Sequence, residues 1–321
     1  MHTILGAGGH ASGALTRELI NARLPVRLIS RRPIATDAPN VSWQPADLLN
    51  HSDLIRAAKG ATVLYLCPGL PYDSTVWRQQ WPTIVRNAIS VAQANQARLI
   101  FLDNVYMYGL VDGPMTETTP YNPMSPKGEV QARTATTVMD EVRAGNLRAS
   151  IARCPDFYGS GASSFYDSTV LDKFAHGQRA QWLGRVDKRH SYLYLPDIGK
   201  AMYLLGQRPD SDNQIWHLPT APALTGREYI SLAAEVFGVP DRYLTVSKTV
   251  TQLLGLFMPF MKNVAEVFYQ YDHDYVFNAD KFERAFGMQP TSYRDGVTTI
   301  ANRLRQPATA FNKPLSPVPT S

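Results

Sequence analysis

A glycine-rich turn close to the amino terminus constrains this chain more than any other feature. Residues 6–12 read Gly-Ala-Gly-Gly-His-Ala-Ser; they follow a short apolar run, lead into a helix-like stretch and precede a second apolar run at 26–29. Glycines in such a turn let the backbone approach a pyrophosphate, and the following helix offers free N–H groups at its start. This order predicts a dinucleotide-binding unit whose pyrophosphate is held by Gly6, Gly8, Gly9 and Ser12. His10 either contacts a phosphate or packs in the turn, and we favour packing because a lone histidine is weak evidence for a ligand.

The residues after the second strand indicate which dinucleotide is bound. An acidic residue there would accept hydrogen bonds from the ribose 2′-OH of NAD and repel the additional phosphate of NADP. This chain has Ser30, Arg31 and Arg32 instead. Two guanidiniums can bind a 2′-phosphate through charge-assisted hydrogen bonds. The sequence therefore predicts NADP as the cofactor; the alternative is that both arginines only solvate the end of a strand.

Composition excludes several other classes of protein. The chain has 321 residues and a net charge of +5, and no run of lysine and arginine is interleaved with aromatic residues, so we expect no nucleic-acid partner. Its two cysteines, Cys67 and Cys154, are too few for a disulfide framework or a zinc site, and we expect no metal. No apolar stretch approaches the ~18 residues of a membrane span, and no leader precedes the glycine turn. We therefore expect a cytoplasmic protein without a membrane partner.

Strands and helices are predicted to alternate through the first half of the chain. Apolar runs at 61–67, 98–102 and 147–153 are typical of buried parallel strands, and helical patterns occupy 77–95 and 131–144. This alternation predicts an α/β fold of the Rossmann type, with a doubly wound parallel sheet. Ligands of such sheets lie at the carboxyl ends of the strands, which adds Cys67, Pro68 and Gly69 to the candidate cofactor contacts.

Beyond residue 159 the alternation stops and aromatic residues become frequent. We expect a Rossmann domain of residues 1–160 and roughly 190–220, a smaller substrate-binding domain of residues 161–189 and 221–305, and a flexible tail at 306–321. Helices are predicted at 226–237 and 253–269. Asp197 is expected to cap a helix that begins at Ile198. Trp77 and Trp81 are interpreted either as part of a homodimer interface or as core residues of the monomer.

Several motifs in this order resemble the extended short-chain dehydrogenase/reductase family, of the NAD(P)-dependent epimerase/dehydratase type. They are the glycine turn, Asp47-Leu48, and the segments 105–109, 153–159 and 191–197, and the resemblance extends from residue 1 to about 304. It implies a Rossmann fold, a nicotinamide dinucleotide and an adenine contact from Asp47 and Leu48. The predicted cofactor contacts are, in full, Gly6, Gly8, Gly9, His10, Ser12, Ser30, Arg31, Arg32, Asp47, Leu48, Cys67, Pro68, Gly69, Asn104, Lys127 and Pro155.

The catalytic pair typical of the family is absent. Members use a Tyr-x-x-x-Lys pair together with a serine or threonine, and the tyrosine acts as acid/base. Aligning residues 125–128 with the family's Ser-Pro-Tyr-Gly places Lys127 at the tyrosine, Gln131 at the lysine and Asn104 at the serine. A register with Lys127 at the family lysine puts Pro123 at the tyrosine. This chain is therefore expected to be an atypical member.

Lys127, Asn104 and Tyr106 are the candidate catalytic residues. A lysine beside a nicotinamide would be partly desolvated, which lowers its pKa and lets it donate a proton. Asn104 would donate a hydrogen bond to a carbonyl oxygen. The alternative is that Lys127 holds the cofactor ribose while Tyr106 packs, without chemistry. The candidate substrate residues are Tyr108, Asp156, Phe157, Tyr158, Trp182 and Arg189. His190 and His217 are further residues that could line the substrate pocket.

These observations predict an NADP(H)-dependent oxidoreductase that acts on a small carbonyl or hydroxyl compound. The first alternative is a non-catalytic NADP-binding sensor or scaffold whose smaller domain meets a protein partner. A third is a sugar-nucleotide epimerase or dehydratase, although both reactions normally rely on the absent tyrosine. A hydrolase is not expected, because no nucleophile-elbow motif is present.

Overall fold

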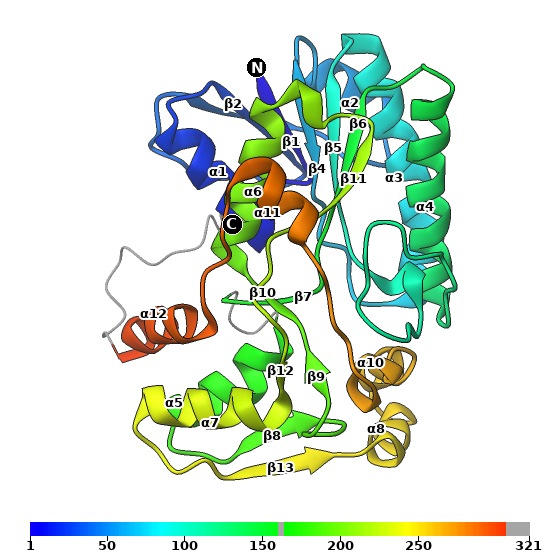
Figure 1. The fold of residues 1–321 in the computed structure, drawn as a ribbon. Coiled ribbons are helices and arrows are strands. Elements are labelled where there is room, and N and C mark those ends of the chain that lie inside the picture. Colours follow the sequence, from blue (N-terminus) through cyan, green and yellow to red (C-terminus); the bar gives the residue numbers. More distant parts are fainter. Residues whose placement is uncertain (160–163, 306–321) are drawn as a thin grey trace.

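A seven-stranded parallel sheet forms the centre of the computed structural model, which describes residues 1–159 and 164–305 (Figure 1). The strand order is β11-β6-β5-β4-β1-β2-β3, and every neighbouring pair is parallel. The predicted doubly wound Rossmann sheet is confirmed. Because the chain leaves β1 toward β2 and returns to β4 on the other side, the topological switch point lies between β1 and β4. The strands are β1 (His2–Leu5), β2 (Val26–Ser30), β3 (Val41–Pro45), β4 (Val63–Leu66), β5 (Arg98–Asp103), β6 (Ala149–Arg153) and β11 (Gln214–His217).

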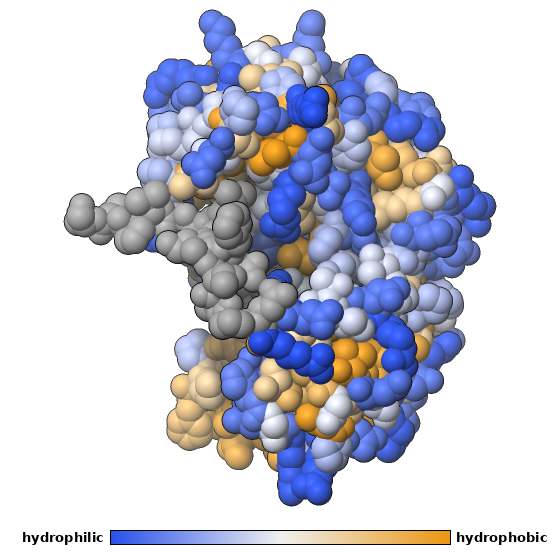
Figure 2. All heavy atoms as spheres, turned by 90° about the vertical axis from the view of Figure 1, so that its left-hand side faces the viewer, coloured by the Kyte–Doolittle hydropathy of each residue, from blue (hydrophilic) through white to orange (hydrophobic). Residues whose placement is uncertain are grey.

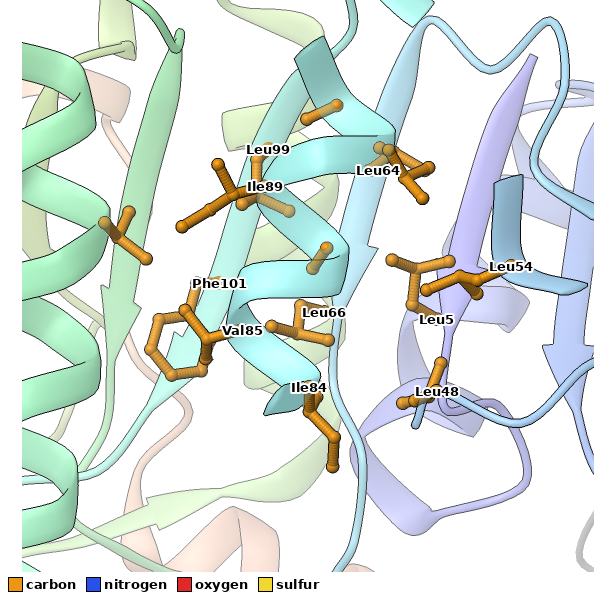
Figure 3. Close-up of a cluster of buried hydrophobic side chains, with 14 of the residues drawn as sticks. Leu5, Leu48, Leu54, Leu64, Leu66, Ile84, Val85, Ile89, Leu99 and Phe101 are labelled. Carbon is orange, nitrogen blue, oxygen red and sulfur yellow. The ribbon is translucent and has the colours of Figure 1, made fainter. Parts of the chain in front are cut away.

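Helices cover both faces of the sheet. One face packs against α2 (His51–Ala57), α3 (Ser74–Asn95) and α4 (Pro126–Arg143). Figure 3 shows Ile84, Val85 and Ile89 of α3 over side chains of β4 and β5. The other face packs against α1 (His10–Asn21), α6 (Leu195–Gln207) and α11 (Asp280–Phe286). Since both faces are buried, the central strands are nearly all apolar, as the runs in the sequence predict.

A second group of elements, the lower lobe, lies below the carboxyl ends of the strands (Figure 1). Its strands pair as β9 with β12 and β8 with β13, and buried aromatic side chains form its core. The short pair β7 (Asp156–Tyr158) and β10 (Tyr192–Tyr194) lies between lobe and sheet. The lobe consists of α5 (Asp172–Ala175), β8 (Ala180–Leu183), β9 (Arg189–His190), β12 (Leu224–Thr225), α7 (Gly226–Phe237), β13 (Tyr243–Val246), α8 (Lys248–Gly255), α9 (Pro259–Ala265), α10 (Tyr269–Asp272) and α12 (Tyr293–Arg305).

Several predicted element boundaries are wrong. Helix α4 begins at Pro126 instead of residue 131, because the Ser125 side chain caps it by accepting from Gly128 N. The helix predicted at 253–269 is divided into α8, α9 and α10, and α9 starts at Pro259, a residue suited to a first helical position. Asp197 is not a cap: α6 begins at Leu195, and the Asp197 carboxylate accepts from the backbone N–H and hydroxyl of Thr291.

The structure also bears on the expected subunit interface and on the surface of the protein. Trp77 and Trp81 are buried in the core of this chain, beside Phe101 and Tyr106, so their burial needs no second subunit. On the side that carries α1, hydrophilic side chains cover most of the surface around the sheet (Figure 2). Within the described residues, no helix combines the length and apolar character needed to cross a membrane, and no cluster of metal-ligating side chains occurs. The predicted tail at 306–321 lies outside the described residues.

Candidate functional site at the carboxyl ends of the strands

The glycine turn joins β1 to α1 at the switch point of the sheet. Gly6 and Gly8 have φ values of +82° and +104°, which favour glycine over residues with a Cβ. A Cβ on Gly6 would also lie 2.6 Å from the Pro68 Cα, so the turn and the loop after β4 are in close contact. Local backbone conformation and tertiary packing therefore both require glycine at position 6.

The start of α1 has no side-chain cap. Its N-cap residue is Gly9, and its first turn carries no acidic residue. The Gly13 N–H donates to Gly9 O and so begins the hydrogen bonding of this helix. The hydroxyl of Ser12 is buried and also donates to Gly9 O, at 2.8 Å. The helix start thus presents N–H groups and a partial positive charge, which suit an anion.

The His10 side chain, at the first position of α1, is exposed, and partial burial still lowers the pKa of its imidazole. Beyond β2, the side chains of Arg31 and Arg32 are also exposed. Neither guanidinium forms an ion pair with a carboxylate of residues 1–159 or 164–305. The Ser30 hydroxyl accepts from the Trp43 indole N–H at 2.9 Å and donates to Arg32 O, which fixes the backbone that carries both arginines.

The loop residues after β3, β4 and β5 are held by local contacts. The Asp47 carboxylate accepts from Leu49 N, and Leu48 is buried beneath it. Cys67 is buried, which raises the pKa of its thiol to about 12 and leaves it uncharged at neutral pH. Gly69 is exposed, whereas Pro155 after β6 is buried. Asn104 accepts from Tyr106 N through its Oδ1 at 3.0 Å, so part of its amide stabilises the loop after β5.

Lys127 is fully buried and is bonded to the lower lobe. Its ammonium group donates to Glu266 Oε2 and to Asn263 O, both at 2.9 Å, and lies 4.3 Å from the ring centre of Tyr72. Burial lowers the pKa of Lys127, and the Glu266 carboxylate opposes that shift. The Tyr72 hydroxyl lies 3.2 Å from that of Tyr106. The structure therefore brings the predicted residues Lys127 and Tyr106 together through Tyr72, with the ammonium group bonded to Glu266 just beyond α9.

Position 131, which aligns with the family lysine, is also buried. Gln131 Oε1 accepts from the Thr134 hydroxyl at 3.1 Å, a contact within one turn of α4. An uncharged amide cannot lower the pKa of a neighbouring acid as a lysine does. The two α4 positions of the family motif therefore hold a paired lysine and a neutral amide.

The six candidate substrate residues lie in three different environments. Tyr108, Tyr158 and Trp182 are buried in hydrophobic clusters. The Tyr108 hydroxyl is bonded to Arg153 and to His217, each at 2.7 Å, and Trp182 stacks on Tyr229. These three side chains therefore form part of the hydrophobic core.

The other three candidates are less enclosed. Arg189 is 55% exposed and pairs with Asp274 at 2.8 Å, so its charge is already compensated. Phe157 is half-buried and packs against the α1–α6 side of the sheet core. The Asp156 side chain is 22% exposed, and its Oδ2 lies 3.1 Å from His190 Nε2 and accepts from the Tyr271 hydroxyl at 3.3 Å. Asp156 is thus a partly accessible carboxylate at the carboxyl end of β6.

Sequence reasoning missed Tyr72, Asn263, Glu266 and Tyr271. Glu266 is 139 residues from Lys127, and Tyr271 is 115 residues from Asp156. No motif surrounds these residues, and aromatic residues are common throughout the second half of the chain. Asn263 and Glu266 reach the site through contacts with Ser74 and Lys127, and Tyr271 reaches it through its contact with Asp156.

Comparisons with known proteins agree with this architecture. A family model described as the NAD dependent epimerase/dehydratase family matches residues 2–218. A dTDP-glucose 4,6-dehydratase of Mycolicibacterium smegmatis is 27% identical over 157 residues, which are 48% of this chain and 42% of that protein. The match therefore spans less than half the length of that relative.

Solved structures resemble nearly the whole chain. The dTDP-glucose 4,6-dehydratase DesIV of Streptomyces venezuelae, with NAD and TYD bound, has a TM-score of 0.76 at 18% identity, over 98% of this chain and 100% of that one. A dTDP-glucose 4,6-dehydratase of Bacillus anthracis in complex with NAD has a TM-score of 0.76 at 14% identity, over 94% and 96%. MoeE5 in complex with UDP-glucose and NAD has a TM-score of 0.75 at 18% identity, over 95% and 98%. At these identities the likeness establishes the fold.

Proposed function

The chain belongs to the NAD-dependent epimerase/dehydratase family, and we propose that it binds NADP(H) and oxidises or reduces a hydroxyl or carbonyl compound. The observation that carries this proposal is the uncapped start of α1 behind a glycine turn, at the switch point of the sheet. A dinucleotide there would supply the hydride acceptor or donor for such a reaction. The N–H groups after Gly8 and Gly9 and the Ser12 backbone would bind its pyrophosphate.

The residues at this site fit a dinucleotide. Left-handed backbone at Gly6 and Gly8 brings the main chain within reach of a phosphate, and no carboxylate stands in the first turn of α1 to repel it. Asp47 and Leu48 after β3 would border the adenine. Cys67, Pro68 and Gly69 after β4 would border the rest of the cofactor, next to Asn104 and Pro155.

Support for NADP over NAD comes from Arg31 and Arg32. Both are exposed beyond β2, where the adenine ribose binds in this class of fold, and both lack an acidic partner within the described residues. Two guanidiniums complement a 2′-phosphate, whereas NAD presents only hydroxyl groups. The similar structures named above contain NAD, so cofactor preference is the first property to measure.

We therefore predict that the double substitution Arg31→Ala/Arg32→Ala weakens NADPH binding about 10- to 100-fold and leaves NADH binding nearly unchanged. The loss of two charge-assisted hydrogen bonds to phosphate has this magnitude. Fluorescence titration with each cofactor measures it. Arg133→Ala, an exposed arginine on α4, is the matched control. Equal wild-type affinities for NADPH and NADH would contradict the prediction.

The substrate class is proposed from the relatives. Their names specify dTDP-glucose and UDP-glucose, so nucleotide sugars are the first compounds to screen, followed by small aldehydes and ketones.

Lys127, Asn104 and Tyr106 remain the residues proposed to activate the substrate. For proton donation, the ammonium group of Lys127 would have to leave Glu266 and Asn263.

The enclosed position of Lys127 favours a second candidate function, a non-catalytic NADP-binding sensor or scaffold. A fully buried, paired lysine cannot exchange protons with a substrate while that pairing persists. NADPH oxidation and NADP⁺ reduction across the substrate panel separate the two functions. Tight NADPH binding without turnover of any compound would favour the sensor.

A further inference from the structure

We propose that Asp156 and His190 share one proton and form the acid/base pair at the substrate oxygen, in place of the absent Tyr-x-x-x-Lys pair. Asp156 is the catalytic residue of this pair and His190 is its positioning residue. The inference rests on the proposed function for its chemistry, but the state of the pair can be measured without substrate.

The hydrogen-bond partners of His190 require the additional proton. Its Nδ1 lies 3.2 Å from Gln270 O, and its Nε2 lies 3.1 Å from Asp156 Oδ2. A carbonyl oxygen and an ionised carboxylate only accept hydrogen bonds, whereas a neutral imidazole has one N–H to donate. Both contacts are satisfied if His190 is an imidazolium, or if Asp156 carries the proton and donates it to Nε2. In either arrangement the pair holds one proton more than a neutral imidazole beside an ionised carboxylate.

A second buried histidine shows the contrast. His217 Nδ1 lies 2.8 Å from Asn278 O, and its Nε2 lies 2.7 Å from the Tyr108 hydroxyl, which can donate. A neutral ring satisfies both of these contacts. The shared proton is therefore specific to the Asp156–His190 pair and does not follow from burial alone.

The surroundings of His190 fix its ring. Its side chain is 3% exposed, and it stacks on Tyr271 at 5.3 Å and on Tyr275 at 4.4 Å between ring centres. The titratable groups that face it are the carboxylate of Asp156 and the phenols of Tyr192, Tyr271 and Tyr275. The adjacent Arg189 and Asp274 compensate each other in an exposed ion pair. Asp156 is thus the carboxyl partner of the ring, and only the Asp156 end of the pair reaches solvent.

Asp156 lies where a substrate of this fold would bind. It is the first residue of β7, three residues after β6 ends at Arg153, and so lies near the carboxyl ends of the sheet strands. Burial raises the pKa of Tyr72 after β4 and of Tyr106 after β5, and the charge of Asp156 adds to both shifts. Its Oδ2 is bonded to His190 and Tyr271, whereas no hydrogen bond of Oδ1 is observed among the described residues. Oδ1 is the atom that would face a substrate oxygen.

The proposed reaction accounts for every proton and electron that is transferred. Reduction of a carbonyl to a hydroxyl needs one hydride at carbon, which the reduced nicotinamide cofactor of the proposed function supplies, and one proton at oxygen. The Asp156 carboxyl group takes up the proton that it shares with His190 at Oδ2, turns about its Cβ–Cγ bond and delivers the proton to the substrate oxygen. The pair then consists of a carboxylate beside a neutral imidazole. Oxidation of the hydroxyl returns the proton to the pair. No further oxidant or reductant is needed.

The first test measures the protonation state without substrate. In protein labelled with ¹⁵N-histidine and ¹³C-aspartate, NMR follows the ring nitrogens of His190 and the carboxyl carbon of Asp156 from pH 6 to 9. At pH 7.5 we expect either an imidazolium at His190 or a protonated carboxyl group at Asp156, and a neutral His190 in Asp156→Asn. A neutral imidazole beside an ionised carboxylate in the wild type at pH 7.5 would overturn the inference.

The second test uses turnover of whichever substrate the screen identifies. We expect Asp156→Asn to lower kcat about 10²- to 10⁴-fold, as loss of a general acid/base does, with NADPH affinity unchanged. Asp156→Glu should restore part of the activity. His190→Gln should shift the pH profile of kcat, and Asp187→Asn, at an exposed ion pair, should leave kcat unchanged.

The two tests distinguish failure of this inference from failure of the proposed function. Full activity in Asp156→Asn together with lost activity in Lys127→Met would assign the proton transfer to Lys127 and overturn the inference alone. Absence of NADPH binding by the wild type would overturn the proposed function, and the NMR result would still decide whether the pair shares a proton.

Discussion

Arg153 is the largest fully buried side chain described, and its charge organises the carboxyl ends of β5 and β6. Its guanidinium lies 3.1 Å from Asp103 Oδ2 and donates to the hydroxyls of Tyr108 and Tyr121 at 2.7 and 2.8 Å. A buried charge is tolerated only when it is paired and hydrogen-bonded. The hydrogen bonds continue from Arg153 through the Tyr108 hydroxyl to His217. A substitution of one of these residues therefore removes a hydrogen-bond partner of the next.

His217 gives the protein a pH dependence that can be measured. Burial, and then the charge of Arg153, lowers the pKa of His217 well below its usual value of 6.5. The unfolded chain therefore binds a proton below pH 6.5 that the folded chain does not. The stability contributed by neutral His217 is present above pH 6.5 and is lost as pH falls below it.

We expect the free energy of unfolding of the wild type to decrease from pH 6.5 to pH 5, and to decrease less steeply in His217→Gln. Urea denaturation at a series of pH values measures both slopes. His176→Gln, at an exposed histidine, should keep the wild-type slope. An identical slope in His217→Gln and the wild type would show that this residue does not titrate on unfolding.

The contact between α1 and α6 explains one glycine that no sequence motif specifies. A Cβ added to Gly199 of α6 would lie 2.5 Å from the Ala14 carbonyl carbon of α1. Gly13 of α1 differs, because an added Cβ there would meet no atom closer than 4.0 Å. Alanine stabilises a helix relative to glycine where space is available, and overpacks the interface where it is not.

These two glycines form a matched pair for a stability experiment. Gly199→Ala should lower the free energy of unfolding by about 1–3 kcal/mol, the typical cost of overpacking. Gly13→Ala should raise it by about 0.4–1 kcal/mol. Thermal denaturation of the two variants is the measurement. Changes of the same sign in both would show that the α1–α6 contact does not restrict position 199.

At the scale of the whole molecule, Lys127 fastens the lower lobe to the sheet. The lysine belongs to α4, and its partners Asn263 and Glu266 belong to α9 and the residue that follows it. Ser74, at the start of α3, donates to the same two residues, to Asn263 Oδ1 through its backbone N–H and to Glu266 Oε2 through its hydroxyl. Two helices of the sheet layer and one segment of the lobe therefore meet at a single buried polar cluster.

Removal of the Glu266 charge should loosen this connection. Glu266→Gln leaves a buried ammonium group without its carboxylate, a loss of about 3–5 kcal/mol where a pair is fully buried and less here, because Glu266 is 22% exposed. We expect faster amide hydrogen exchange over residues 248–272 and unchanged exchange in β4 and β5.

The double variant Lys127→Met/Glu266→Gln, which removes both charges, should restore part of the protection. Glu129→Gln, at an exposed position of α4, serves as the control. Faster exchange throughout the sheet in Glu266→Gln would show that the cluster stabilises the whole fold and does not join its two parts.

Local patterns alone determined the parallel sheet and its glycine turn. Apolar runs specify strands that are buried on both faces, and glycines specify left-handed backbone at positions 6 and 8, because each effect acts over a few neighbouring residues. The same reasoning failed at helix ends such as that of α4, where a single side-chain cap at Ser125 moved the start by five residues.

Only the tertiary structure decided which polar side chains meet at the site. Lys127 and Glu266 are 139 residues apart, and Asp156 and His190 are 34 residues apart. No periodicity in the sequence encodes such contacts, because they depend on how complete helices and strands pack. The packing of the two parts of the molecule places Lys127 beside the Glu266 carboxylate, and it places His190 beside Asp156, with which it shares a proton. The physical reason is that a buried charge is stable only beside a compensating partner.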